Sequence, residues 1–253
     1  MSLFVQEIKR SYKAPLIIFA LGAIVTFGLK SRTGVFESSL VFDILIFVLP
    51  MSATIASFVV SKRYGNSKIF GRSYFLLGCG FFFLFLGEFL YFVYDDVLDS
   101  SILDTFDYLF LASTGFTLSH IVINVRYFAE KIEPYQKILA ILIPVLIVLS
   151  YSFLVFANGH KPDYYFFFNL LFVSFAAVNL GLVVVGFTLF RHTVLISAWF
   201  LLLIGFFVST LGDLEFRYYH TFGGDYLANN SSVLWISSLM ILVYALYKHQ
   251  KAI

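Results

Sequence analysis

Long apolar runs separated by short polar segments make up most of this chain. A helix needs about 20 mainly apolar residues to cross a bilayer. Eight runs meet or approach this length, at residues 14–30, 40–61, 73–94, 105–125, 137–157, 165–190, 194–214 and 231–248. The polar connections are too short for a domain outside the membrane. The pattern predicts an all-α integral membrane protein with eight transmembrane helices.

The positions of lysine and arginine predict how these spans are oriented. With a cytoplasmic N-terminus, 13 of the 17 basic residues fall on the cytoplasmic side, and the other 4 are Lys30, Arg32, Lys161 and Arg217. Cytoplasmic loops usually carry such an excess of positive charge. We therefore expect both termini to be cytoplasmic in a cell (plasma) membrane.

Two stretches of the chain repeat one pattern at an offset of 125 residues. Each begins Gly-Phe-Phe and continues to a Gly-acid pair near the end of an apolar run. The matched positions are Gly80 and Gly205, Phe81 and Phe206, Phe82 and Phe207, Gly87 and Gly212, Glu88 and Asp213, and Tyr94 and Tyr219. The offset covers four spans, so it predicts two parallel four-helix repeats, residues 1–132 and 133–253, in one compact membrane domain.

Composition narrows the function classes. The chain is 60% hydrophobic and only 13% charged, whereas soluble domains carry about 25% charged residues. The net charge of +2 gives no signal for nucleic-acid binding, and the single cysteine, Cys79, excludes an intramolecular disulfide. We expect membrane lipids as neighbours, and we predict no cofactor and no metal site.

Glu88 and Asp213 are the strongest candidate site residues. A carboxylate inside an apolar span costs several kcal/mol if it faces lipid, so such acids usually face the bundle interior or a cavity. In the predicted orientation both belong to the outer half of the membrane, where other acidic residues gather. The predicted ligand-binding set comprises Glu88, Tyr91, Asp95, Asp107, Asp213 and Asp43.

His120 lies deep in the fourth predicted span. Three roles remain open for it: a packing residue, a proton-relay partner of Glu88, or a metal ligand. A single histidine without a second one at ligand spacing is a weak metal signal.

The Gly-acid elements resemble those of a known class of membrane sensor. Gly87-Glu88 with Tyr91, and Gly212-Asp213 with Phe216, are similar to the duplicated Gly-Asp-x-x-Tyr element of multi-span sensor modules ahead of bacterial diguanylate cyclases and histidine kinases. Residues 87–95 and 124–128 also resemble small archaeal membrane proteins. This resemblance implies a non-enzymatic module that binds a small ligand, a cation or a lipid headgroup and signals through a separate membrane protein.

A second resemblance implies an enzyme. Gly87-Glu88, the Gly115-Phe116-x-x-x-His120 stretch and Asp213 are similar to elements of the eight-span lysoplasmalogenase-like family. This likeness implies an intramembrane lipid hydrolase in which Glu88 and Asp213 act as general acid and base, with His120 holding or relaying the proton. Here Glu stands where that family usually has Asp.

Overall fold

Seven long helices make up most of the described chain. The computed structural model describes residues 13, 15–18, 20–22, 40–65, 67–93, 103–128, 132–222 and 231–252. The helices are α3 (Leu40–Arg63), α4 (Phe70–Phe92), α5 (Leu103–Phe128), α6 (Pro134–Ala157), α7 (Tyr164–Phe190), α8 (Ile196–Thr221) and α9 (Ser231–Ala252). All seven contain a segment long and apolar enough to cross a membrane, and these ranges contain no strand. They support a multi-pass helical membrane protein.

The helix boundaries follow the apolar runs, with one large difference. Seven of the predicted spans each coincide with one helix, while most of the span predicted at 14–30 lies outside the described residues. The difference is at α8, which we expected to end near residue 214 but which continues to Thr221. Its last two turns are polar and aromatic, so hydropathy alone reads them as a loop.

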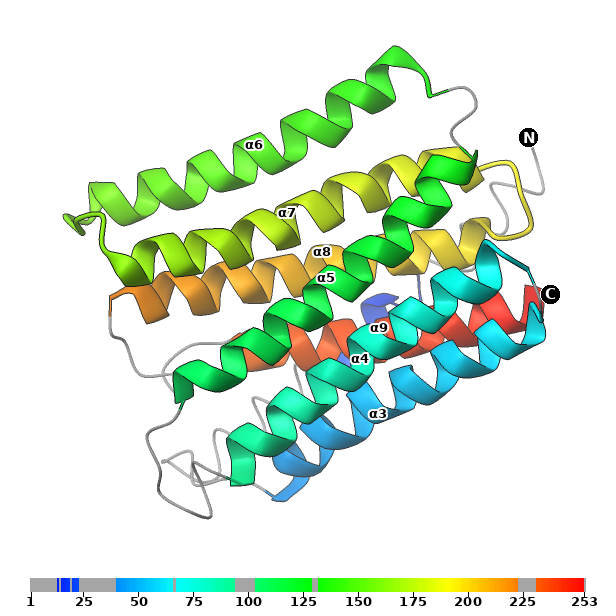
Figure 1. The fold of residues 1–253 in the computed structure, drawn as a ribbon, viewed down its shortest axis with the longest axis horizontal. Helices are drawn as coiled ribbons and strands as arrows, with labels where there is room; N and C mark the ends of the chain where they lie inside the picture. Colours follow the sequence, from blue (N-terminus) through cyan, green and yellow to red (C-terminus); the bar gives the residue numbers. More distant parts are fainter. Residues whose placement is uncertain are drawn as a thin grey trace.

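Six of the helices form a closed ring. Going around it, α3 packs on α4, α4 on α5, α5 on α7, α7 on α8, α8 on α9, and α9 again on α3. Neighbouring helices in the sequence run in opposite directions (Figure 1). In this ring α4 and α8 are separated by two helices on either side. The helices that carry Glu88 and Asp213 therefore lie opposite one another.

Helix α6 lies outside the ring, against α7 and to a smaller extent α8 (Figure 1). The contact with α7 is close because Gly181 has no side chain, and a Cβ there would come within 3.0 Å of the Pro144 ring. Elsewhere α6 exposes a continuous apolar surface, which includes Ile138, Ile141, Val145, Leu149 and Phe153. Such a surface suits lipid.

The repeated glycines occupy equivalent helix contacts. A Cβ on Gly87 would come within 2.8 Å of the Phe110 ring on α5, and one on Gly212 within 2.8 Å of the Trp235 ring on α9. Gly80 and Gly205 allow the same close approach one heptad earlier on each helix. The glycine beside each acid thus lets the following helix approach, and this explains physically why the Gly-acid pair recurs.

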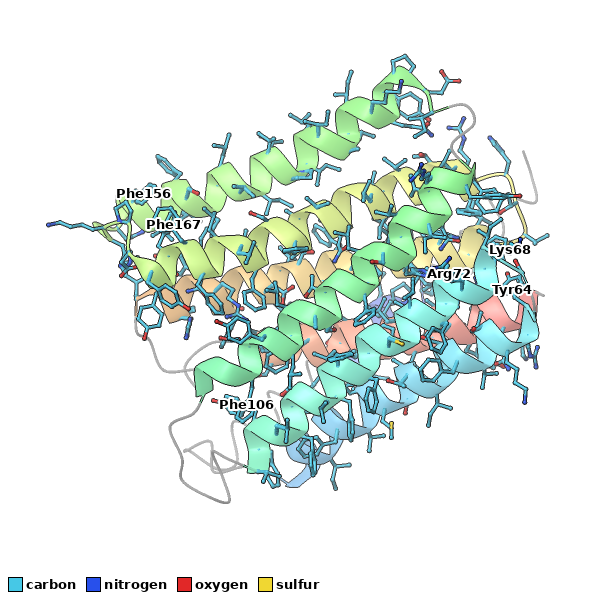
Figure 2. All side chains as sticks on the ribbon, viewed as in Figure 1. Tyr64, Lys68, Arg72, Phe106, Phe156 and Phe167 are labelled. Atoms are coloured by element: carbon cyan, nitrogen blue, oxygen red, sulfur yellow. The ribbon has the colours of Figure 1, made fainter. Side chains whose placement is uncertain are left out.

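The two ends of the bundle differ in their side chains. Tyr64, Lys68 and Arg72 lie at one end, and Phe106, Phe156 and Phe167 lie at the other (Figure 2). At the first end Arg63 donates a hydrogen bond to the carbonyl of Gln250 (2.9 Å), which joins the end of α3 to the end of α9. At the second end the Asp163 carboxylate caps α7 by accepting from the Phe166 amide (2.8 Å), and this bond lowers the pKa of Asp163.

Candidate functional site

A cavity of about 370 Å³ lies within the six-helix ring. Every ring helix contributes lining residues, and α6 contributes none. The charged residues of the lining, Glu88, Asp107, Asp213 and Arg217, lie toward the end of the bundle where α4 finishes and α5 and α9 begin. Of the predicted ligand-binding set, Glu88, Tyr91, Asp107 and Asp213 line this one cavity.

Two members of the predicted set are not placed. Asp43 belongs to the first turn of α3, but its side chain lies outside the described residues, as does Asp95 entirely.

Glu88 faces the cavity because of its helical register. Phe81, Leu84, Glu88 and Tyr91 all line it, and their spacing of three, four and three residues keeps them on one face of α4. The Glu88 side chain is partly buried, and it has no hydrogen bond or ion pair with any other described residue. It is thus a carboxyl group in an apolar cavity that nothing in the described chain neutralises.

Asp213 has a specific partner. The indole Nε1–H of Trp235 on α9 donates to its Oδ1 at 2.9 Å. The same Trp235 ring packs against Gly212, so the Gly-acid pair both allows α9 to approach and provides the acceptor for its indole. One carboxylate oxygen of Asp213 is therefore engaged by the protein.

Arg217 forms a buried ion pair with Asp107. Its Nη2 lies 3.0 Å from Asp107 Oδ1, its Nη1 donates to Asn169 Oδ1 at 3.3 Å, and its guanidinium carbon lies 3.7 Å above the Phe172 ring. His220 Nδ1 also contacts Asn169 Oδ1, at 3.2 Å. The assignment of Arg217 to an outside loop is therefore wrong: the extended α8 carries it into the bundle, where a carboxylate, an amide and a ring surround it.

His120 belongs to a different cluster. It does not line the cavity but is fully buried, with Nδ1 2.7 Å from Ser73 Oγ, and Asn124 also donates to that hydroxyl. The ring of Tyr74 packs edge-on against His120 with centroids 4.7 Å apart. The structure therefore does not bring His120 together with Glu88.

Two tyrosines and a second histidine extend this cluster to the end of the bundle. His249 on α9 contacts the Tyr74 hydroxyl through Nδ1 (2.9 Å) and the Tyr64 hydroxyl through Nε2 (2.7 Å). Burial raises the pKa of Tyr64, in the turn after α3, to about 12, which keeps its hydroxyl protonated. No pattern along the chain predicted this cluster, because its members come from three separated segments.

Metal binding finds no support in the described part of the chain, where no three His, Cys, Asp or Glu side chains form a group that could hold an ion. No family model, curated protein or solved structure matches this chain. The geometry of the cavity is therefore the basis of the function proposed below.

Proposed function

We propose that this chain is a sensor-like, multi-pass membrane module that binds a small ligand or a lipid headgroup in the cavity within the six-helix ring. The observation that carries the proposal is that Glu88, Tyr91, Asp107 and Asp213, from three different helices, line one cavity. Ligand sites in proteins are typically concave, largely apolar and fitted with a few convergent polar groups. In a sensor, ligand binding at this site would be signalled to a separate membrane protein.

The energetics of the embedded acids support a binding role. A charged side chain within a membrane is costly unless it is paired or serves a function. Asp107 is paired with Arg217, and Asp213 accepts from Trp235, but Glu88 has no such partner among the described residues. A ligand that interacts with Glu88 would offset part of this cost.

The duplication and the topology are part of the proposal. Around the ring, α3, α4 and α5 are followed by α7, α8 and α9. A shift of three positions around the ring therefore brings α4, which carries Glu88, onto α8, which carries Asp213. This order supports two parallel repeats. We propose eight spans in all, cytoplasmic termini, and an acid-lined cavity in the outer half of the plasma membrane.

Cysteine labelling tests the topology. In a Cys79→Ala background, we expect Val97→Cys to react with a membrane-impermeant maleimide added to intact cells. Asn66→Cys should react only after permeabilisation, because the positive-inside rule assigns its basic loop to the cytoplasm. The reverse labelling pattern, or labelling of both positions from outside, would contradict the proposed orientation.

Filling the cavity should remove the bound molecule. Ala176 on α7 is a small lining residue, so Ala176→Phe directs a ring into the cavity. We expect native mass spectrometry of protein released from lipid nanodiscs to detect a bound small molecule or lipid on wild type and not on this variant. Val122→Phe, at an exposed position of α5 outside the lining, is the matched control and should behave like wild type. Equal occupancy of all three proteins would contradict the proposal.

An intramembrane lipid hydrolase is the second candidate function. The observation in its favour is that Glu88 and Asp213 line the same cavity, as a general acid and base must. His120 belongs to another cluster, so the proton relay through it has no geometric support. Aldehyde release from a vinyl-ether lysolipid by wild type, lost in both Glu88→Gln and Asp213→Asn, would favour this enzyme over the binding module.

A further inference from the structure

The strongest hydrogen-bond donors among the described lining residues already have partners within the protein. The Arg217 guanidinium is engaged by Asp107 and Asn169, and the Trp235 indole by Asp213. The hydroxyls of Thr114 and Thr210 donate to carbonyls one turn earlier on their own helices. The hydroxyls of Ser113, Thr117 and Ser209 also line the cavity and can either donate or accept.

Asn179 gives independent support for this inventory. Its side chain lines the cavity from α7, is only 4% exposed, and its Oδ1 accepts no hydrogen bond from any described residue. Its amide nitrogen makes a single long contact, 3.5 Å, to the carbonyl of Thr114. A buried acceptor without a partner destabilises the folded protein, so native proteins usually satisfy such an atom with water or a ligand.

The charged groups of the cavity also favour a ligand that donates hydrogen bonds. Among the described residues, the carboxyl groups of Glu88, Asp107 and Asp213 line it, together with the Arg217 guanidinium and the His220 imidazole. Since Arg217 is paired with Asp107, the carboxyl groups of Glu88 and Asp213 outnumber the cationic groups left in this part of the lining. A positively charged ligand is therefore complementary to the cavity, whereas an anion would meet like charge.

The walls indicate that this cation is organic. Most of the lining is apolar, and eight aromatic rings of the described residues contribute to it, those of Phe81, Tyr91, Phe110, Phe172, Phe206, Phe216, Tyr219 and Trp235. Aromatic faces attract cations and also bury hydrocarbon. A volume of about 370 Å³ is far more than a bare metal ion needs, and it falls in the usual range for small organic ligands.

We propose that the ligand is an organic ammonium ion whose N–H groups bind the Glu88 carboxylate and whose hydrocarbon part packs on the aromatic walls. This inference rests on the proposed binding function and specifies its ligand class. Asn179 Oδ1 accepts a hydrogen bond from the same ligand or from a water that accompanies it. Such an amine has two sources, an amino headgroup of a membrane lipid or a free amine.

Four probes with one hydrocarbon chain test the ligand class. Purified protein in detergent is unfolded thermally at pH 7 in the presence of hexylamine, hexanol, hexanoate or hexyltrimethylammonium. Hexylammonium should raise the unfolding temperature at concentrations about tenfold lower than hexanol, because it adds a charge-assisted hydrogen bond. Hexanoate should be weakest. The quaternary amine should be weaker than hexylammonium because it has the charge without N–H donors.

Two variants assign the effect to the cavity acid. In Glu88→Gln the preference for hexylammonium over hexanol should disappear, while Glu215→Gln, on α8 but outside the cavity lining, should keep it. Glu88→Ala serves in place of Glu88→Gln should that variant fail to fold. A preference that persists in every cavity variant would overturn the inference.

The failures of the two proposals are distinguishable. If hexanol stabilises as well as hexylammonium and Ala176→Phe removes both effects, the cavity binds ligands but the ammonium inference is wrong. If no probe discriminates wild type from Ala176→Phe, both proposals fall. Nanodiscs with and without phosphatidylethanolamine distinguish the sources: retention of that lipid on wild type, lost in Glu88→Gln, identifies a headgroup amine, while hexylammonium selectivity without lipid retention identifies a free amine.

Discussion

Replacement of Arg217 by methionine is expected to lower the free energy of unfolding by about 3–5 kcal/mol, the usual cost of removing one member of a buried ion pair. The loss arises because the Asp107 carboxylate stays buried in the bundle after its ion-pair partner, the guanidinium that lies 3.0 Å away in the wild type, is removed. Asn169 also loses a donor, and Phe172 loses the cation above its ring. Thermal unfolding in detergent, followed by tryptophan fluorescence, measures the change.

The double variant Arg217→Met with Asp107→Leu is the control. Removing both charges leaves no unpaired group, so most of the stability should return, as it commonly does when a buried ion pair is replaced by apolar residues. A single Arg217→Met variant as stable as wild type would show that the ion pair contributes little. A double variant that is no more stable than the single one would assign the loss to packing against Phe172.

Arg217 also illustrates what hydropathy could not predict. The sequence around it contains Glu215, Tyr218 and His220. A segment with such low hydropathy is predicted to be a loop. Its carboxylate partner lies 110 residues earlier in the sequence, on α5. The helical state of this segment is stabilised by that distant partner, and a single sequence contains no record of the contact.

The long helices were predictable for the opposite reason. Helix α6, for example, was expected over 137–157 and occupies Pro134–Ala157. Its side chains are mostly exposed, so its length is set by its own composition rather than by tertiary contacts. The helix begins three residues earlier than expected, after a capping box in which Gln136 accepts from the amide of the N-cap residue Glu133 at 2.8 Å.

The candidate site was only partly predictable. Glu88 and Asp213 were conspicuous because an acid recurs at one offset in an apolar setting, and both line the cavity. One of the three roles left open for His120 paired it with Glu88, and the structure does not bring the two together, since depth along a span says nothing about which face of the helix carries a residue. Asn179 was overlooked because a single amide in an apolar run has no pattern around it.

Among the described glycines, Gly186 is the one at which an added Cβ would come closest to another atom. That Cβ would overlap the six-membered ring of the Trp199 indole. Trp199 is fully buried, and it stacks on Phe190 with ring centroids 4.5 Å apart. Because the indole is packed in this way, α7 and α8 would have to separate to make room for a side chain at Gly186.

Gly186→Leu should therefore lower the free energy of unfolding by about 3 kcal/mol or more, at or above the upper end of overpacking costs. Gly115→Leu is the matched control: nothing lies within 4 Å of a Cβ placed there, and replacing a helical glycine gains up to about 1 kcal/mol in helix propensity. The unfolding temperature of Gly186→Leu should fall, whereas that of Gly115→Leu should rise or stay unchanged. Equal destabilisation of both would mean that α7 and α8 do not pack through Trp199 in this way.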